Sequence, residues 1–73
     1  MFIVIELQTN DSGELGNLVW SFDKKEQAEN KYYSVLSYAA VSDLPVHSAV
    51  ILDEQGSLIN SHVFFHKTEE DEN

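Results

Sequence analysis

The sequence predicts an α+β domain of the order ββαββ, in which a single helix packs on one face of a four-stranded antiparallel sheet. Four short segments rich in apolar residues predict strands, and in the first, Met1 to Thr9, β-branched side chains alternate between two faces with a period of two. They form two pairs, and each pair is joined by a turn containing glycine, which is typical of antiparallel hairpins. The only long segment with helical periodicity lies between the pairs. The order in which the hairpins join is left open.

The segment between the two pairs predicts a helix over residues 24–41. Its apolar side chains recur at i, i+4, i+7, i+8 and i+11, and these are Ala28, Tyr32, Val35, Leu36 and Ala39. We expect Asp23 to be the N-cap, with Glu26 three residues later completing a capping box. Pro45 disfavours helical dihedrals in the residue before it, so the helix should end before that point.

The first hairpin is expected to pair residues 1–9 with residues 17–22. The intervening residues 10–16, NDSGELG, supply the Asn, Asp and Gly that turns require. The register that gathers most large apolar side chains on one face pairs Leu7 with Leu18, Ile5 with Trp20 and Ile3 with Phe22. This register directs these six side chains toward the helix.

The second hairpin is expected to pair residues 47–53 with residues 57–66. Residues 53–56, DEQG, predict a type I turn that closes with Gly56 in the left-handed region. In the resulting register Asp53 opposes Ser57, Ile51 opposes Ile59 and Ala49 opposes Ser61.

Both faces of the predicted sheet are apolar, although one helix covers only one of them. An antiparallel sheet with one face in water is normally polar on that face. The sequence therefore predicts a homodimer or a higher homo-oligomer, with a candidate oligomer interface at Phe2, Val4, Val19, Val50, Leu52, Leu58 and Phe64. The alternative is that strand ends and loops cover these residues.

The composition limits the classes of partner. The formal net charge is −9, from 13 acidic residues and four lysines, with no arginine. Direct nucleic-acid binding is therefore not expected, because phosphate recognition relies on basic patches. Residues 1–66 are expected to form one domain and residues 67–73, KTEEDEN, a disordered acidic tail. An alternative function is an acidic inhibitor that acts as a decoy on a basic nucleic-acid-binding host protein.

The sequence also indicates a cytoplasmic setting. There are no cysteines, which excludes disulfides. The first ten residues lack the basic region of a signal peptide, and no segment reaches the roughly 20 apolar residues of a membrane span.

No catalytic, metal or cofactor motif is found in the sequence, so we expect no enzyme and no cofactor. His62 and His66 would stand roughly 13 Å apart on one strand, too far to share a metal ion. His47 is expected on the opposite face, and the three histidines are interpreted as structural or surface residues. The glycines fit turns and match no phosphate-binding pattern.

The segment from Gly16 to Val50 contains LVWSFD, AENKYYSVLSYAAVS and PVHSAVIL. In these motifs the chain resembles small proteins of Gram-positive bacteria, their phages and prophages, a family with no attached activity. The resemblance implies a bacterial or viral cytoplasmic origin and supplies no functional residue. The function expected from the sequence is a non-enzymatic, self-associating interaction module of phage or prophage origin.

Overall fold

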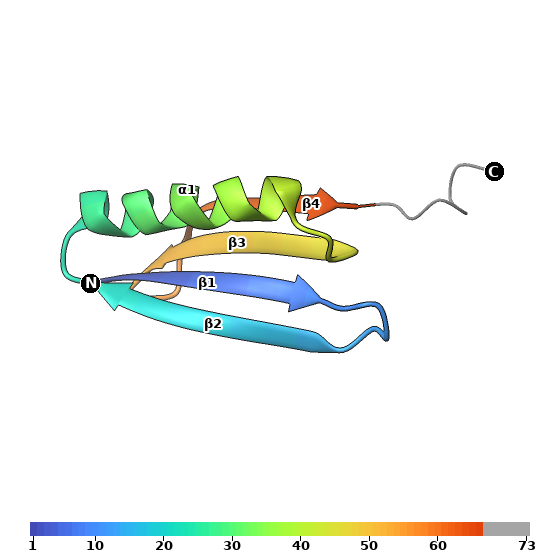
Figure 1. Cartoon of the computed structure of the whole chain (residues 1–73). Coiled ribbons are helices and arrows are strands. Elements are labelled where there is room, and N and C mark those ends of the chain that lie inside the picture. The colour runs from blue at the N-terminus through green and yellow to red at the C-terminus, as the bar shows by residue number, and fades with distance from the viewer. Residues whose placement is uncertain (67–73) are drawn as a thin grey trace.

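The computed structural model describes residues 1–66, and the expected acidic tail at 67–73 lies outside the described residues. The elements are β1 (Phe2–Thr9), β2 (Leu15–Phe22), α1 (Lys25–Val41), β3 (Val46–Asp53) and β4 (Leu58–Phe65) (Figure 1). The predicted α+β fold of order ββαββ is confirmed.

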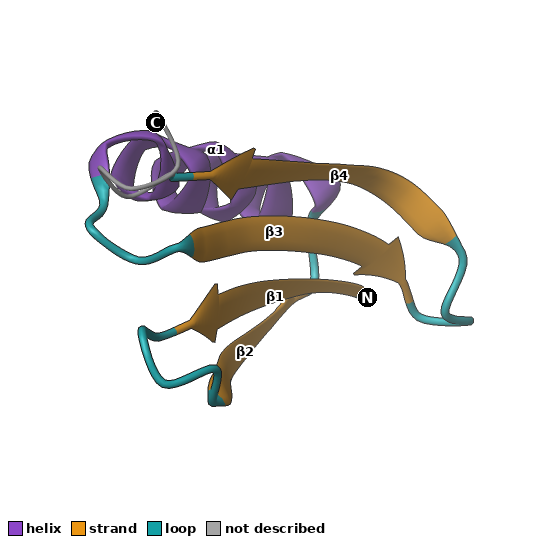
Figure 2. Cartoon of the chain, turned by 90° about the vertical axis from the view of Figure 1, so that its right-hand side faces the viewer, coloured by secondary structure: helices purple, strands orange, loops and turns teal. Residues whose placement is uncertain are grey.

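The four strands form one antiparallel sheet in the order β2-β1-β3-β4. The two hairpins therefore join through β1 and β3, and β2 and β4 are the edges. The helix α1 leads from the end of β2 at one edge to the start of β3 in the centre, and it lies on one side of the sheet (Figure 2). Its contacts are mainly with the central strands β3 and β1.

The helix agrees closely with the predicted range 24–41. The predicted apolar stripe is confirmed, because Ala28, Tyr32, Val35 and Ala39 are all buried. The predicted N-cap is wrong: the helix is preceded by Lys24 in an extended conformation, and no side chain caps the first turn. At the other end Ser42 is extended and its backbone N–H donates to the carbonyl of Ala39.

The predicted register of the first hairpin is wrong by one residue. Val4 pairs with Trp20 and Glu6 with Leu18, so the even-numbered residues of β1 face the helix. The turn explains the shift. The Asn10 side chain accepts hydrogen bonds from the backbone N–H groups of Ser12 and Glu14, which closes a shorter loop and starts β2 at Leu15. A shift of one residue moves every side chain to the other face.

The second hairpin closes as predicted and then departs from the expected register. Gly56 has φ +87°, and its N–H donates to the Asp53 carbonyl at 3.0 Å. An irregularity between Ile51 and Leu52 then shifts the pairing. The predicted pairs Ile51–Ile59 and Ala49–Ser61 are wrong, since the observed pairs are Ile51–Asn60 and Ala49–His62. The bulge allows Ile59 to pack against the core.

The hydrophobic core lies between α1 and the central strands. Its buried members are Val4, Ala28, Tyr32, Val35, Ala49 and Ile51, with Phe2, Trp20, Phe22, Leu36 and Ile59 packed around them. The small side chains of Ala28 and Ala49 are fully buried at this contact. Each large aliphatic side chain buried here contributes about 1.5–3 kcal/mol. The core thus fixes which sheet face is covered.

Candidate functional site

The sheet face away from α1 is the largest candidate site, and it is called the open face below. Residues paired directly across antiparallel strands share a face, so the register assigns its members. They are Ile3, Ile5, Leu7 and Thr9 of β1; Leu15, Asn17, Val19 and Ser21 of β2; Val46, Ser48, Val50 and Leu52 of β3; and Leu58, Ser61, Val63 and Phe65 of β4. Within these four strands, no open-face position holds a charged residue.

Strand β1 shows the unusual character of this face most clearly. Its three largest aliphatic side chains, Ile3, Ile5 and Leu7, lie on the open face. The face of β1 beneath the helix instead includes Val4 and the carboxylate of Glu6. The more apolar side of this central strand is therefore the side that the helix leaves uncovered.

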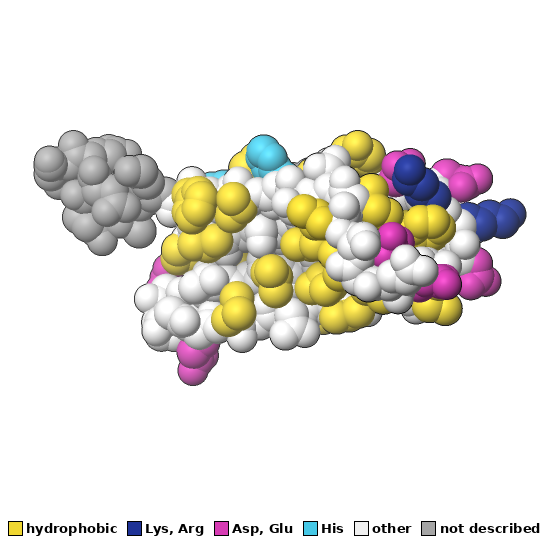
Figure 3. Space-filling view, turned by 180° about the vertical axis from the view of Figure 1, so that it is seen from behind, with side chains coloured by type: hydrophobic (Ala, Val, Ile, Leu, Met, Phe, Trp, Pro, Cys, Tyr) yellow, Lys and Arg dark blue, Asp and Glu magenta, His cyan; other side chains and the backbone are white. Residues whose placement is uncertain are grey.

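Apolar side chains of the edge strands extend this surface. Val19 is 58% exposed, Leu58 61% and Phe65 69%. Figure 3, which shows the molecule from behind, displays groups of hydrophobic side chains with polar side chains and backbone between them; acidic side chains lie toward both ends of the view and lysine side chains at its right end. Apolar residues dispersed singly are ordinary on protein surfaces, whereas a contiguous set of this size marks an interaction surface.

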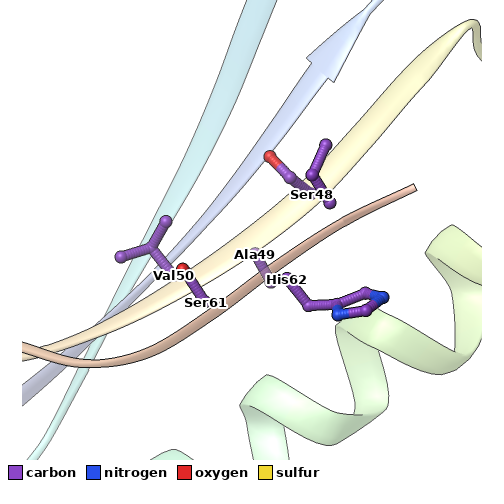
Figure 4. A pocket seen from close by; sticks show the side chains of 6 residues that line it. Ser48, Ala49, Val50, Ser61 and His62 are labelled. Atoms are coloured by element: carbon purple, nitrogen blue, oxygen red, sulfur yellow. The ribbon is translucent and has the colours of Figure 1, made fainter. Parts of the chain in front are cut away.

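A shallow hollow of about 420 Å³ lies along the paired strands β3 and β4. Figure 4 shows Ser48 and Val50 pointing away from the helix, while His62 points toward it. The short side chains of Ser48 and Ser61 stand among larger aliphatic neighbours, so the open face is uneven rather than flat. A stable contact with such an uneven apolar surface requires a partner with a complementary shape.

The structure separates the seven residues predicted for an oligomer interface. Val19, Val50, Leu52 and Leu58 lie on the open face. Phe2 and Val4 do not, because both belong to the core beneath the helix and Val4 is 0% exposed. Phe64 pairs with the buried His47 and shares its face. The one-residue errors in the predicted registers explain why these residues were assigned to the wrong face. They also explain why Ile3, Ile5 and Leu7 were not predicted on the open face.

A second candidate site is a chain of three polar side chains beneath the C-terminal end of α1, called the Ser42–His47–Glu6 chain below. The Nε2 atom of His47 lies 2.5 Å from Oε2 of Glu6, and its Nδ1 lies 2.9 Å from Oγ of Ser42. His47 is 4% exposed and Glu6 8% exposed. Ser42, the residue after the helix, is only partly buried.

The neighbours of this chain limit the directions that its hydrogen bonds can take. Nε2 of Gln8 also donates to Oε2 of Glu6, at 2.8 Å, so this oxygen accepts from two sides. When the imidazole of His47 is neutral with its proton on Nε2, its Nδ1 is an acceptor. In that tautomer the hydroxyl of Ser42, whose Oγ accepts from the N–H of Leu44 at 3.4 Å, can donate to His47.

Sequence patterns do not predict this cluster. The predicted register placed Glu6 on the face away from the helix, and His47 was interpreted as a structural or surface residue. In the observed pairing of β1 with β3, Glu6 lies opposite Ala49, two residues along each strand from the Gln8–His47 pair and on the same face. No residue spacing predicts this meeting, because it depends on two strand registers and a helix end.

The other titratable groups contribute to packing. Nε2 of His66 lies 2.7 Å from the carbonyl oxygen of Ala39, so it can donate to the last turn of the helix. The ring of His62 meets Phe64 edge to face. Burial raises the pKa of the Tyr32 phenol, and the neighbouring Tyr33 adds to the rise. Within residues 1–66 no three His, Asp or Glu side chains cluster with metal-binding geometry.

No helix in the described part of the chain is both long and apolar enough to span a membrane. Comparisons with protein-family models, with curated proteins and with solved structures each give no match to this chain.

Proposed function

We propose that the protein is a self-associating interaction module, in which the open face of one copy packs against the open face of a second. The observation that carries this proposal is the orientation of β1, which turns Ile3, Ile5 and Leu7 away from the core. This orientation does not help a monomer. If β1 were turned over, the three aliphatic side chains would lie beneath the helix and Glu6 would not be buried, which would avoid the cost of removing its carboxylate from water. A second sheet packed on the open face gives these residues a partner.

Charge favours a second copy as the occupant. The chain carries a net charge of −9, so two copies repel each other wherever their acidic residues approach. The open-face positions of the four strands are uncharged, which keeps the charges of both copies at the rim. A basic partner would instead gain from acidic side chains at the contact itself, and these positions offer none.

The size of the face is adequate for a dimer. Each strand has eight residues, and at roughly 3.3 Å per residue and about 4.8 Å between strands the face covers about 500 Å². Two such faces bury about 1,000 Å² in total, which is near the lower bound of a specific interface. A contact between identical faces closes with two-fold symmetry, so we propose a homodimer.

The setting that we propose is the cytoplasm of a bacterium or of a phage-infected cell. Support comes from the resemblance to proteins of Gram-positive bacteria and their phages, and from a sequence without cysteine.

The test compares two substitutions that place the same charge on different surfaces. Ile5→Lys puts an ammonium group in the middle of the open face, whereas Ser37→Lys puts it on the exposed side of α1. We expect wild type and Ser37→Lys to have the mass of a dimer in light scattering at micromolar concentration, and Ile5→Lys that of a monomer. Circular dichroism establishes that each variant is folded.

Two results contradict the proposal. One is a wild-type chain that is monomeric throughout the micromolar range. The other is a dimer that Ile5→Lys and Val50→Lys leave intact, because the contact would then use another surface. If the chain is monomeric and captures a basic protein at low salt but releases it at high salt, the acidic inhibitor is favoured instead.

A further inference from the structure

We propose that Ser42 is a nucleophile and that the Ser42–His47–Glu6 chain activates it toward acyl donors such as small activated esters. This proposal assigns the protein a chemical activity in addition to self-association. It differs from the expectation from the sequence that the protein is not an enzyme. The three side chains come from the end of α1, from β3 and from β1.

The hydrogen bonds are ordered as a nucleophile, a base and an orienting carboxylate must be. The Ser42 hydroxyl donates toward Nδ1 of His47, and Nε2–H of His47 donates to Glu6, at the distances given above. The amide of Gln8 holds the carboxylate in turn. This is the arrangement of roles in which an imidazole takes a proton from a serine and a carboxylate stabilises the imidazolium.

The ring of His47 lies between the Glu6 carboxylate and Ser42, which directly follows the last residue of α1. In the proposed step the ring takes up the proton of Ser42 with the Glu6 carboxylate beside it, which is the position from which a carboxylate orients an imidazole and stabilises the imidazolium.

The burial of Glu6 is itself evidence for such a role. An aliphatic side chain at this position would join the core next to Val4 without any desolvation cost. Where a natural sequence breaks such a packing rule, it often does so at a functional site. The base and the carboxylate are buried, whereas Ser42 is partly exposed, so a reagent can reach the nucleophile before the groups that activate it.

A recess of about 200 Å³ lies next to the residues that support the Ser42–His47–Glu6 chain. Gln8 and Leu44 line it, together with Asn10, Glu14, Leu15 and Gly16 of the first hairpin. Gln8 donates to Glu6 and the N–H of Leu44 donates to Ser42, so two of its walls belong to residues that position the polar chain. Ser42, His47 and Glu6 do not themselves line the recess, and its volume admits a short acyl donor next to the residues that position them.

The proposed step is acyl transfer from an ester to Ser42. Oγ forms a bond to the carbonyl carbon of the ester, and its proton passes to Nδ1 of His47. The tetrahedral intermediate then breaks the bond to the alcohol oxygen, which leaves with the electron pair and recovers the proton from Nδ1. The products are acyl-Ser42 and a free alcohol, and His47 and Glu6 return to their initial states.

The test is the reaction of the full chain with p-nitrophenyl acetate. We expect a burst of p-nitrophenolate close to one equivalent per chain, and an acetyl group on Ser42 in peptide mass spectrometry. Ser42→Ala should abolish both. His47→Gln should slow acetylation by about a hundredfold, the typical contribution of a general base, and Glu6→Gln should slow it to a smaller degree.

Matched controls separate activation from ordinary surface reactivity. Ser37→Ala removes an exposed hydroxyl of α1, and His62→Gln removes an exposed imidazole of β4, so neither should change the rate. Circular dichroism shows whether His47→Gln and Glu6→Gln are folded, and Ser42→Ala remains decisive if they are not. Acetylation of the wild type at lysine or tyrosine only, or no acetylation, would overturn the proposal.

Discussion

The two faces of the sheet differ in a way that reverses the usual expectation. The face beneath α1 buries a polar chain that includes Glu6 and His47, while the face that no element of residues 1–66 covers carries Ile3, Ile5 and Leu7. In a sheet that folds and works as a monomer, the charged residue would lie outside and the three aliphatic residues inside. The difference teaches that the distribution of polar and apolar residues alone does not indicate which face of this sheet the helix covers.

Strand β1 therefore contributes side chains to two surfaces that differ in composition. On the covered face, Val4 and Ile51 are paired neighbours in the core, and the paired residues Glu6 and Ala49 follow them. On the open face, Ile5 pairs with Val50 and Ile3 with Leu52. Substitutions at adjacent positions of one strand therefore measure the contributions of the covered face and of the open face separately, in the same backbone.

The largest effect is expected where adjacent residues of β3 are compared. Ile51→Ala removes a side chain that is 1% exposed, so it should lower the free energy of unfolding by about 2–5 kcal/mol at every protein concentration. Val50→Ala on the open face should mainly remove the part of the stability that rises with concentration, because that part comes from association. Urea unfolding at two protein concentrations measures both.

Equal, concentration-independent losses for Ile51→Ala and Val50→Ala would contradict this contrast. The two faces would then contribute to a single monomeric fold in the same way.

The second effect concerns the polar chain on the covered face. Glu6→Leu leaves His47 and Gln8 without their shared acceptor, and should cost about 1–3 kcal/mol. His47→Leu with Glu6→Leu removes both members of the His47–Glu6 contact, so the double variant should recover part of the loss although Gln8 still lacks its acceptor. Urea unfolding of the singles and the double variant gives the coupling energy, which a cluster without mutual dependence would leave near zero.

Glu26→Ala is the matched control for this cycle. It removes an exposed carboxylate from the first turn of α1, and should cost only a few tenths of a kcal/mol through the helix dipole.

Sequence patterns alone predicted most of the fold and only part of the candidate sites. The helix, its buried stripe and the hairpin turn at Gly56 followed from periodicity and turn chemistry, which are local signals. The register of β1 did not, because it was chosen to collect the most apolar side chains on one covered face. The chain instead follows the turn at Asn10, and the apolar preference fails as a guide because both faces of β1 carry aliphatic residues.

A third prediction tests whether that turn sets the register. Asn10→Ala removes the side-chain oxygen that accepts from the N–H groups of Ser12 and Glu14, and should cost about 0.5–2 kcal/mol, as loss of a helix cap does. The effect should appear as faster hydrogen exchange in β1 and β2, while β3 and β4 keep their protection. Uniform loss across all four strands would show that the turn acts only on global stability.

The smallest effect is expected at high pH, and it reports on the covered face alone. Burial raises the pKa of the Tyr32 phenol, with a further rise from Tyr33, so the folded chain keeps this proton at a pH where the unfolded chain loses it. The stabilisation is complete below the unfolded pKa of about 10 and declines as the pH rises above it, because the unfolded state then binds fewer protons. Tyr32→Phe should flatten this decline in urea midpoints measured between neutral and strongly alkaline pH. Tyr38→Phe, at a residue 72% exposed, should leave it unchanged. If both variants decline as the wild type does, the alkaline loss arises outside the core, and the titration no longer distinguishes the covered face from the open one.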